Sequence, residues 1–208
     1  MKKTLYVTLT GLLLLAGAAL WAASAPKPVK PVTTAVTVAV DGFTCPMCPD
    51  GLQKDLAKLP GVSHVKATLD PAQVTATLDE TKTTVSKLVA AISAHPQAMD
   101  VKKTYTGHLV AQIDTTMCAK NAKMCDGCFV EIPKVLKKIA GVSDVALDAN
   151  GKVAYIGFAP GATVTTKAIS KALAASDYHF TTRFNVPVPQ AATAPSAAAE
   201  KCMSCEDR

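Results

Sequence analysis

The sequence contains an internal repeat, which limits the folds that the chain can adopt. The 18 residues from Cys48 (CPDGLQKDLAKLPGVSHV) align with those from Cys128 (CFVEIPKVLKKIAGVSDV), and eight positions are identical. Cys45 matches Cys125 at the same offset of 80 residues, but upstream of the cysteines the offset falls to 73. The second copy therefore has a seven-residue insertion before its cysteine pair, and this insertion contains Cys118. Such self-similarity indicates two copies of one structural unit.

The first copy shows the periodicities of alternating strands and helices. Residues 34–40 alternate as a half-buried strand does, whereas later apolar residues recur at helical spacing. Gly61 stands where the end of a helix favours a left-handed residue, and Asp70-Pro71 marks a hairpin turn. The expected elements are a strand at 34–40, a helix with Leu52, Leu56 and Leu59, strands at 65–70 and 73–79, a helix with Val85, Leu88, Val89 and Ile92, and a strand at 100–106.

The second copy gives the same order of elements. It predicts strands at 108–114, 143–148, 152–158 and 178–184, a helix within 132–141, and a helix through Ala168, Ile169, Ala172 and Leu173. Asn150-Gly151 is a strong hairpin signal between two of these strands. The order β-α-β-β-α-β is that of the ferredoxin-like fold. We therefore expect an α+β protein of two tandem domains, 34–106 and 107–186, each an antiparallel sheet with two helices on one face.

The two ends of the chain differ in composition from the repeat. Residues 1–25 have two lysines, a long apolar run and small residues, the layout of a secretory signal peptide, and the run is also long enough to remain as a membrane anchor. Residues 26–33 form a proline-rich leader, and 187–208 a Pro/Ala-rich tail that ends in a third cysteine pair. The chain is therefore expected outside the cytoplasm, in the periplasm or cell envelope.

Charge and composition argue against nucleic-acid binding and against catalysis. The formal net charge of +6 falls to +4 without Lys2 and Lys3, and only 5% of residues are aromatic. A basic stripe interleaved with aromatic residues is not present, so nucleic acid is not an expected partner. The four histidines are scattered, and no serine-histidine-acid set or paired catalytic carboxylates can be picked out. We do not expect an enzyme.

Cysteines are the unusual feature of the sequence. Six of the seven form pairs with two residues between them, and one is left over; they are Cys45, Cys48, Cys118, Cys125, Cys128, Cys202 and Cys205. Cysteines in an exported chain are often disulfide-bonded, but an odd number in close pairs fits long-range disulfides poorly. Disulfide formation, electron transfer and metal binding all remain open from spacing alone.

The segment GFTCPMC, followed by Gly61-Val62 after a predicted helix, resembles the heavy-metal-associated domain family. This family includes copper metallochaperones and the periplasmic mercury-binding protein. Gly42, Thr44 and both cysteines match its motif, whereas Phe43 replaces the usual methionine, which packs below the loop. The resemblance spans about residues 34–184. It implies a metal site at Cys45 and Cys48.

In the second copy only Cys125 and Cys128 correspond to the family motif, because residues 115–124 replace the lead-in. Cys118 is an addition there. Residues 202 and 205 form a further candidate pair in the tail.

Prolines predict where the helices after the cysteines begin. Proline is favoured at the first helical position and disfavours a helical conformation in the residue before it. Pro49 therefore places Cys48 at the cap and Cys45 in the loop, near the helix N-terminus that favours a thiolate. Pro133 implies a regular start no earlier than about residue 130, so the second pair is expected on a loop.

Two thiolates in an exposed loop suit a soft ion that accepts two ligands. Cu(I) is the favoured ion and Hg(II) the next; Zn(II) would need Cys118, Cys125, Cys128 and a fourth donor. Methionines near the cysteines also carry soft sulfur, although Met47 and Met124 are expected to be gap-filling side chains.

The leading hypothesis is an exported protein that captures or transfers a soft metal ion. Its expected partners are the ion and a metal-transporting membrane protein or another metallochaperone. Two alternatives remain: a thiol-disulfide redox protein that uses the CPMC motif, and a scaffold module whose disulfides only rigidify loops.

Overall fold

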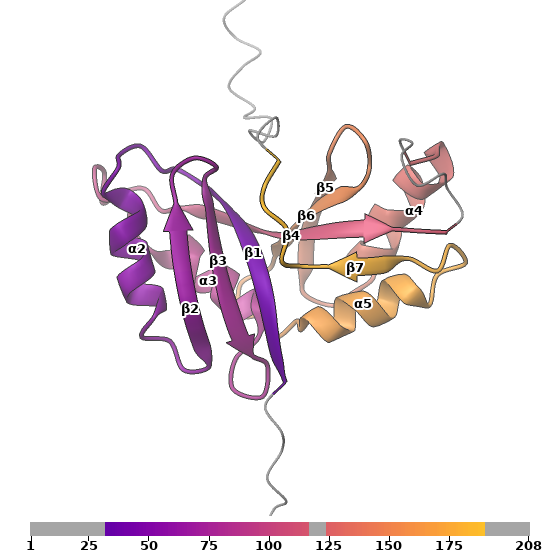
Figure 1. Ribbon diagram of the computed structural model, residues 1–208, viewed down its shortest axis with the longest axis horizontal. Helices are drawn as coiled ribbons and strands as arrows, with labels where there is room; N and C mark the ends of the chain where they lie inside the picture. Colours follow the sequence, from indigo (N-terminus) through magenta and orange to yellow (C-terminus); the bar gives the residue numbers. More distant parts are fainter. Residues whose placement is uncertain (1–31, 117–123, 190–208) are drawn as a thin grey trace, which may run out of the picture. The chain divides into compact units, whose positions relative to one another are not determined.

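The computed structural model describes residues 32–116 and 124–189, which contain seven strands and four helices (Figure 1). In chain order these are β1 (Thr33–Asp41), α2 (Cys48–Leu56), β2 (Val62–Thr68), β3 (Gln73–Asp79), α3 (Val85–Ala94), β4 (Thr106–Asp114), α4 (Asp126–Lys137), β5 (Val142–Leu147), β6 (Val153–Phe158), α5 (Thr166–Ala174) and β7 (Thr181–Arg183). We call β1 through β4 the first half and β4 through β7 the second half, so that β4 is counted in both.

The first half has the strand order of a ferredoxin-like unit. Its strands lie in the order β2-β3-β1-β4, and all neighbours are antiparallel. The three valines of the predicted period-2 strand at 34–40, Val36, Val38 and Val40, are buried. They pack against the four predicted apolar positions of α3, which are buried as well. The alternating and helical periods therefore predicted this core correctly.

The second half repeats the same order and uses a strand of the first. Its strands lie in the order β5-β6-β4-β7, so β4 is at once the last strand of the first unit and the first strand of the second. One edge of β4 pairs with β6; the other pairs with β1 through Thr106–Val110 and with β7 through Gln112–Asp114. The α+β class and the antiparallel pairing are confirmed. The prediction of a separate sheet for each domain was wrong, because one continuous sheet serves both halves.

The strand expected at 100–106 is absent from the described residues. Only Thr104 forms an isolated bridge, to Pro96, and the Lys103 amide donates to the carbonyl of Asp100 in a tight turn. Two adjacent lysines interrupt any alternation here, whereas Leu109 and the apolar residues after it supply the buried face of β4. The expected domain boundary after residue 106 thus falls inside β4.

Both hairpins form where the turn residues predicted them. Asp70-Pro71 lies between β2 and β3, and Asn150-Gly151 lies between β5 and β6. Gly61 and Gly141, at matching positions of the repeat, adopt positive φ angles of 82° and 98°. This left-handed conformation favours glycine and explains why both copies have it before the next strand.

Contacts beyond the sheet join the two halves. The buried Ser86 hydroxyl of α3 donates to the carbonyl of Ala162 and accepts from the amide of Val164, both at 2.8 Å. The Glu80 carboxylate accepts from the amide of Thr166 at 2.7 Å and so caps α5. These bonds lie between segments that are distant in the sequence, and they fix the second half against α3.

The segment after β7 also crosses between the halves. The carbonyl of Phe184 accepts from the Thr37 amide at 2.8 Å, and the Val188 amide donates to the side chain of Gln73 at 2.8 Å. Val188 is buried against Val110 and neighbouring side chains. Residues 184–188 therefore fasten β1 and β3 to the second half.

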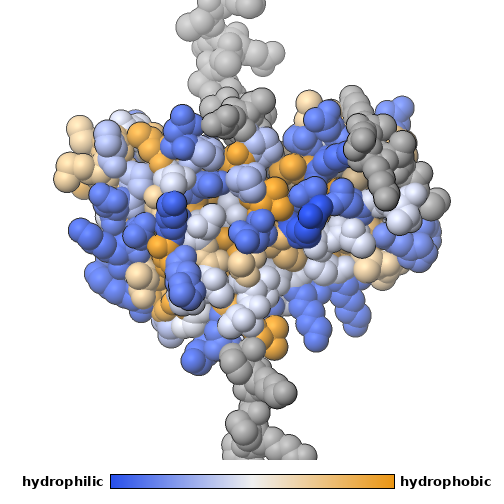
Figure 2. Space-filling model, in the orientation of Figure 1, coloured by the Kyte–Doolittle hydropathy of each residue, from blue (hydrophilic) through white to orange (hydrophobic). Residues whose placement is uncertain are grey.

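Polar side chains cover most of the visible surface, with small apolar areas between them (Figure 2). Large exposed hydrophobic residues are few among those described; they are Val32, Met47, Leu69, Met99, Val101 and Val130. Within residues 32–116 and 124–189, every helix is too short or too polar to cross a membrane.

Candidate metal centres

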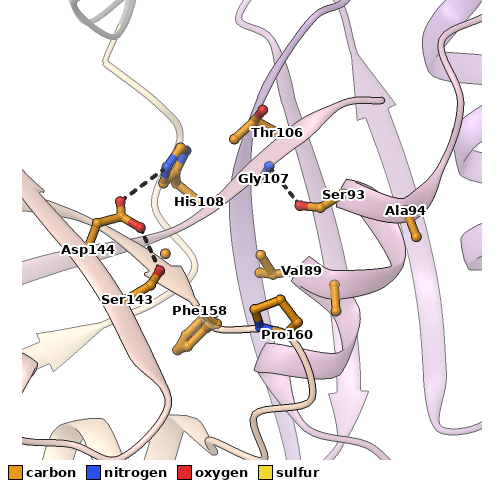
Figure 3. A pocket seen from close by; sticks show the side chains of 12 residues that line it. Val89, Ser93, Ala94, Thr106, Gly107, His108, Ser143, Asp144, Phe158 and Pro160 are labelled. Atoms are coloured by element: carbon orange, nitrogen blue, oxygen red, sulfur yellow. Dashed lines mark hydrogen bonds and ion pairs between the residues drawn. The ribbon is translucent and has the colours of Figure 1, made fainter. Parts of the chain in front are cut away.

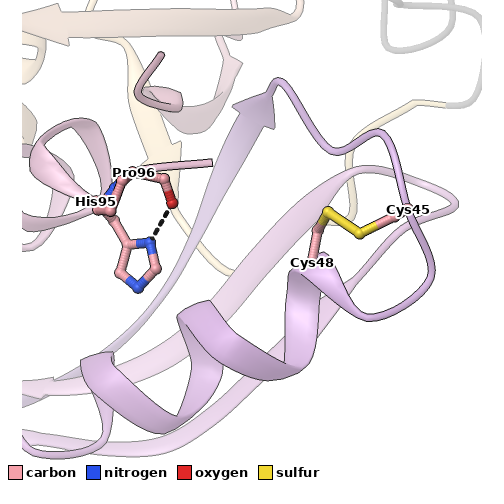
Figure 4. Close-up of a disulfide and its surroundings, with 4 residues drawn as sticks. All are labelled: Cys45, Cys48, His95 and Pro96. Carbon is pink, nitrogen blue, oxygen red and sulfur yellow. Dashed lines mark hydrogen bonds between the residues drawn. A yellow bond between two sulfur atoms is a disulfide. The ribbon is translucent and has the colours of Figure 1, made fainter. Parts of the chain in front are cut away.

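The first cysteine pair lies at the N-terminus of α2 (Figure 4). Cys48 is the first helical residue and is only 2% exposed, whereas Cys45 lies in the preceding loop and is half-buried. The Cys48 amide donates to the Cys45 carbonyl at 3.1 Å, which holds the loop in a tight turn. The two residues form a disulfide with Cα atoms 5.4 Å apart. The helix begins one residue earlier than Pro49 predicted, but both sulfurs lie near its positive end, as expected.

A stack of rings supports this loop from below. The ring of Phe43 packs edge-on against Tyr105 at a centroid distance of 5.2 Å, and Tyr105 stacks on His95 at 5.8 Å. Phe43 therefore has the packing role that the family's methionine suggested. Tyr105 is 2% exposed and lies directly before β4, so this stack fixes the loop to the start of that strand.

The stack ends on a carboxylate of α2. Nε2 of His95 lies 2.9 Å from Oδ2 of Asp55, and the Lys58 ammonium lies 2.7 Å from Oδ1. The hydrogen bonds with Lys58 and then with His95 hold the pKa of Asp55 below its ordinary value. In the sequence His95 is only one of four scattered histidines, yet in the structure it joins the helix of the first pair to the aromatic stack.

Methionine positions differ between the two pairs. Met47, between the cysteines of the first pair, is 78% exposed, so the expectation that it fills a gap was wrong. It is the N-cap residue of α2 and is not part of the buried core. Met124, before the second pair, is 4% exposed and joins the core, as a gap-filling residue does.

The second cysteine pair lies at the N-terminus of α4. Cys125 is the N-cap residue and is exposed, whereas Cys128 lies in the first turn and is fully buried. Their sulfur atoms are 3.3 Å apart, which is a hydrogen-bonding distance and longer than a disulfide bond. The pair thus has the same arrangement as the first, with an accessible leading sulfur and a buried second one.

The expected loop position of this second pair was wrong. The helix starts at Asp126, and Pro133 lies inside it. A proline removes one helical hydrogen bond, but the buried face of α4, which includes Ile132, Val135 and Leu136, packs against the core and outweighs that loss. Core packing therefore overrode the local proline signal.

A tyrosine holds the first turn of α4 in place. A Cβ atom on Gly127 would lie 2.6 Å from the Tyr178 hydroxyl, so the missing side chain lets the ring approach the helix closely. The Thr115 hydroxyl donates to the carbonyl of Tyr178 at 2.7 Å, and Thr115 directly follows β4. The second pair is therefore attached to the end of β4, as the first is attached to its start.

The other candidate ligands lie outside the described residues; they are Cys118, Cys202 and Cys205. Among the residues that are described, no three His, Cys, Asp or Glu side chains are grouped to hold a metal ion. Each pair therefore offers two sulfur ligands, and the three-sulfur site with Cys118 stays a prediction. Sequence reasoning missed Tyr105 and Tyr178, because each contacts a segment that is distant in the sequence: Tyr105 contacts Phe43, and Tyr178 lies against Gly127.

A pocket of about 330 Å³ lies between α3 and the β5–β6 hairpin, and no cysteine of either pair lines it (Figure 3). Its histidine, His108 on β4, points toward Asp144, with Nε2 and Oδ2 3.4 Å apart. Nδ1 lies 3.9 Å from a carboxylate oxygen of Asp41. This histidine therefore contacts both halves and contributes to their junction.

Comparison with known proteins identifies the class of the chain. The heavy-metal-associated domain matches residues 37–96, which include the first cysteine pair. The periplasmic component of the mercuric transport protein of Serratia marcescens is 37% identical over 86 residues, which are 41% of this chain and 94% of the relative. The Shigella flexneri protein of the same name is 38% identical over 86 residues, which are again 41% of this chain and 94% of the relative. The chain belongs to the heavy-metal-associated domain family.

Two solved structures show weaker similarity. Oxidized MerP from Ralstonia metallidurans CH34 is 41% identical, with 29% of this chain and 85% of that chain covered and a TM-score of 0.28. The water-soluble region of the P-type ATPase CopA from Bacillus subtilis is 19% identical, with 74% and 93% covered and a TM-score of 0.35. These TM-scores are too low to support an inference about the chain.

Proposed function

We propose that this protein is exported and that it captures a soft metal ion and transfers it through the thiolates of its CxxC pairs. The observation that carries the proposal is the first pair, at a helix N-terminus in the segment that matches the heavy-metal-associated domain. Cys45 and Cys48 are the principal ligands, and Cys125 and Cys128 form a second site. The proposed activity is binding and transfer rather than catalysis.

The site chemistry suits two-coordinate binding of a polarisable cation. Thiolates are soft ligands, and the positive end of α2 favours their anionic form. The first pair must be reduced before it binds, because a disulfide has no thiolate to donate. That reduction takes two electrons and two protons from a dithiol, which becomes a disulfide in turn.

Mercury and copper are the two candidate ions. The sequence favoured Cu(I), but the relatives described above are named for mercuric transport. Both ions accept two sulfur ligands, so the site geometry suits either. We put Hg(II) first and Cu(I) second, and Zn(II) would need more ligands than one pair provides.

The unequal exposure of the two sulfurs suggests an order of steps for transfer. A thiolate of the partner adds to the ion beside the more accessible sulfur, that of the half-buried Cys45 or the exposed Cys125, and a three-coordinate ion results. The more accessible sulfur then leaves and takes up the proton that the incoming thiol released. A second thiolate of the partner then adds to the ion, and the buried Cys48 or Cys128 leaves last and takes up the second proton. A metal-transporting membrane protein or a second metallochaperone with paired cysteines fits this exchange.

Export is proposed from the sequence and from the named relatives. The signal-like segment, residues 1–25, lies outside the described residues. Relatives that match most of their own length are named as periplasmic components. Fractionation of the host cell, with detection of the chain in the envelope or periplasm, tests this point.

Metal binding is tested by counting ions on the reduced protein under nitrogen. Hg(II) and Cu(I) are added in separate titrations against a competing chelator, and bound ions per chain are measured. Cys45→Ser and Cys125→Ser are each expected to remove one site, whereas the matched Ser63→Cys variant, which adds an unpaired thiol elsewhere, leaves both sites intact. Unchanged binding in both serine variants would contradict the proposal.

Thiol-disulfide exchange is the second candidate, because the first pair forms a disulfide at a helix N-terminus. An insulin-reduction assay tests it. Activity in the unmodified chain that disappears in Cys45→Ser, together with metal binding no stronger than in that variant, would favour the redox function.

A further inference from the structure

The two cysteine pairs lie at opposite ends of one strand. β1 runs antiparallel to β4 with Asp41 opposite Thr106, so the loop that leaves β1 emerges at the start of β4. The chain toward the second pair leaves from Asp114, the other end of the same strand. In Figure 1, α2 and α4 accordingly lie beyond opposite ends of β4.

Side-chain contacts keep each pair at its own end. The loop of the first pair is fixed through Phe43 to Tyr105, the residue immediately before β4. The first turn of α4 lies against Tyr178, whose carbonyl accepts from Thr115, immediately after β4. Neither pair folds back along the strand.

The length of β4 sets the separation. Its nine residues span about 27 Å, because an antiparallel strand rises about 3.4 Å per residue. A metal–sulfur bond is about 2.3 Å, as for zinc, so two sulfurs on one ion lie at most about 5 Å apart. The four thiolates therefore cannot share an ion within one chain.

Motion between the halves does not bring the pairs together. The halves share β4 itself, so no linker separates them. Ser86, Glu80 and Thr37 bind the second half through hydrogen bonds of 2.7 to 2.8 Å. Bringing the two cysteine pairs together would require β4 to break its pairing with one of its neighbouring strands.

We propose that the chain carries two soft metal ions at once, at a fixed separation, and that neither ion passes directly between the two pairs of one molecule. This inference rests on the proposed function and adds the fixed separation and the independence of its two sites. A partner protein can then reach the ion at one pair equally well whether the other pair holds an ion or not.

The experiment uses the reduced full chain with Cys118, Cys202 and Cys205 replaced by alanine, so that only the two pairs remain. Hg(II) is added to one and two equivalents, and X-ray absorption counts the sulfur atoms around each ion. Two ions, each with two sulfurs, are expected. In the same background, Cys45→Ala with Cys48→Ala should leave one ion at the second pair with unchanged affinity, and Cys125→Ala with Cys128→Ala gives the reverse control.

One ion with four sulfurs would overturn the inference. So would a change of more than about tenfold in the affinity of one pair when the other is removed, since that shows coupled sites. A second measurement does not depend on metal. Spin labels on Cys45 and Cys125, with the other five cysteines replaced by alanine, should lie more than about 20 Å apart by pulsed electron paramagnetic resonance.

The two readouts separate the possible failures. If the reduced chain binds no ion, the proposed function is contradicted. The distance between the two spin labels then still tests the separation of the two pairs. A label distance below about 15 Å overturns the inference even if both pairs bind metal.

Discussion

At the scale of single residues, the first pair depends on side chains that carry no sulfur. Phe43 and Tyr105 come from opposite ends of the first half, and their contact holds the loop between Gly42 and Cys48 on the sheet. A loop that is fixed in this way presents its sulfurs in a constant arrangement. Supporting groups around metal ligands affect affinity for the same reason.

Phe43→Ala is expected to weaken the first site without affecting the second. Loss of a half-buried ring should reduce the free energy of unfolding by about 1–3 kcal/mol. The looser loop should lower metal affinity at the first pair by about tenfold. Chelator competition and thermal unfolding measure both effects. Phe43→Met, which has the residue usual in the family, is the control and should retain most of the affinity; equal losses in both variants would contradict a packing role.

Asp55 gives a pH-dependent contribution to stability. Its pKa is lowered from 3.8 by hydrogen bonds with Lys58 and His95, so the ionised form is favoured in the folded state. That stabilisation is present above the unfolded pKa and is lost as the pH falls through the folded pKa. Asp55→Asn should therefore have a slightly lower Tm than the unmodified protein near neutral pH. The difference should vanish when thermal unfolding is measured well below pH 3.8, and a difference that persists there would exclude this cause.

At the scale of elements, α3 is the helix that both halves use. Its residue Ser86 accepts a hydrogen bond from the backbone of the second half and donates another to it. A buried backbone amide that loses its acceptor is costly, because water cannot replace the partner. This hydroxyl therefore contributes to the contact between the β6–α5 loop and α3, together with the Ser86 amide, which donates to the carbonyl of Val164 at 3.4 Å.

Ser86→Ala is expected to destabilise the protein by about 1–3 kcal/mol, since it leaves the Val164 amide without its side-chain acceptor. Chemical denaturation measures the loss. Ser63→Ala removes an exposed hydroxyl that donates to Thr77 and should change stability by less than about 0.5 kcal/mol. Similar effects of the two substitutions would show that the contact contributes little.

The elements also show what the sequence could and could not predict. Period-2 and helical spacing located β1, β3 and α3, because apolar residues mark one face of each. Pro133 gave the wrong start for α4, because its effect is local whereas packing of the helix is not. At the sites, spacing and repeat identified Cys45, Cys48, Cys125 and Cys128, although their binding role is still a prediction. The contact of Phe43 with Tyr105 joins residues far apart in the chain, and periodicity carries no information about it.

At the scale of the whole molecule, the main feature is that two repeats use one strand. The repeat predicted two complete sets of elements with eight strands, whereas the described residues contain seven, because the last strand of one set is also the first strand of the other. Pairing on both edges of β4 decides this, and pairing is a property of tertiary structure. The halves are therefore expected to unfold together.

A single unfolding transition is the corresponding prediction. Leu78→Ala in β3 and Ile156→Ala in β6 each create a cavity in the core and should cost about 2–5 kcal/mol. Because both halves need β4, each substitution should shift the one transition seen by calorimetry and by circular dichroism. Val130→Ala, at a 69% exposed position, is the control and should have little effect. Two separate transitions, each sensitive to only one of the substitutions, would show that the halves are independent.

The buried position of Val188 has a consequence for whatever follows it in the chain. Val188 lies against Val110, the midpoint of β4, so the continuation of the chain begins about equally far from both strand ends. A ligand group tethered beyond this point would have a similar effective concentration at either end. One such group could therefore reach both ends of β4 equally well. Shortening the segment that connects it to Val188 would reduce its contact with the two ends by comparable factors.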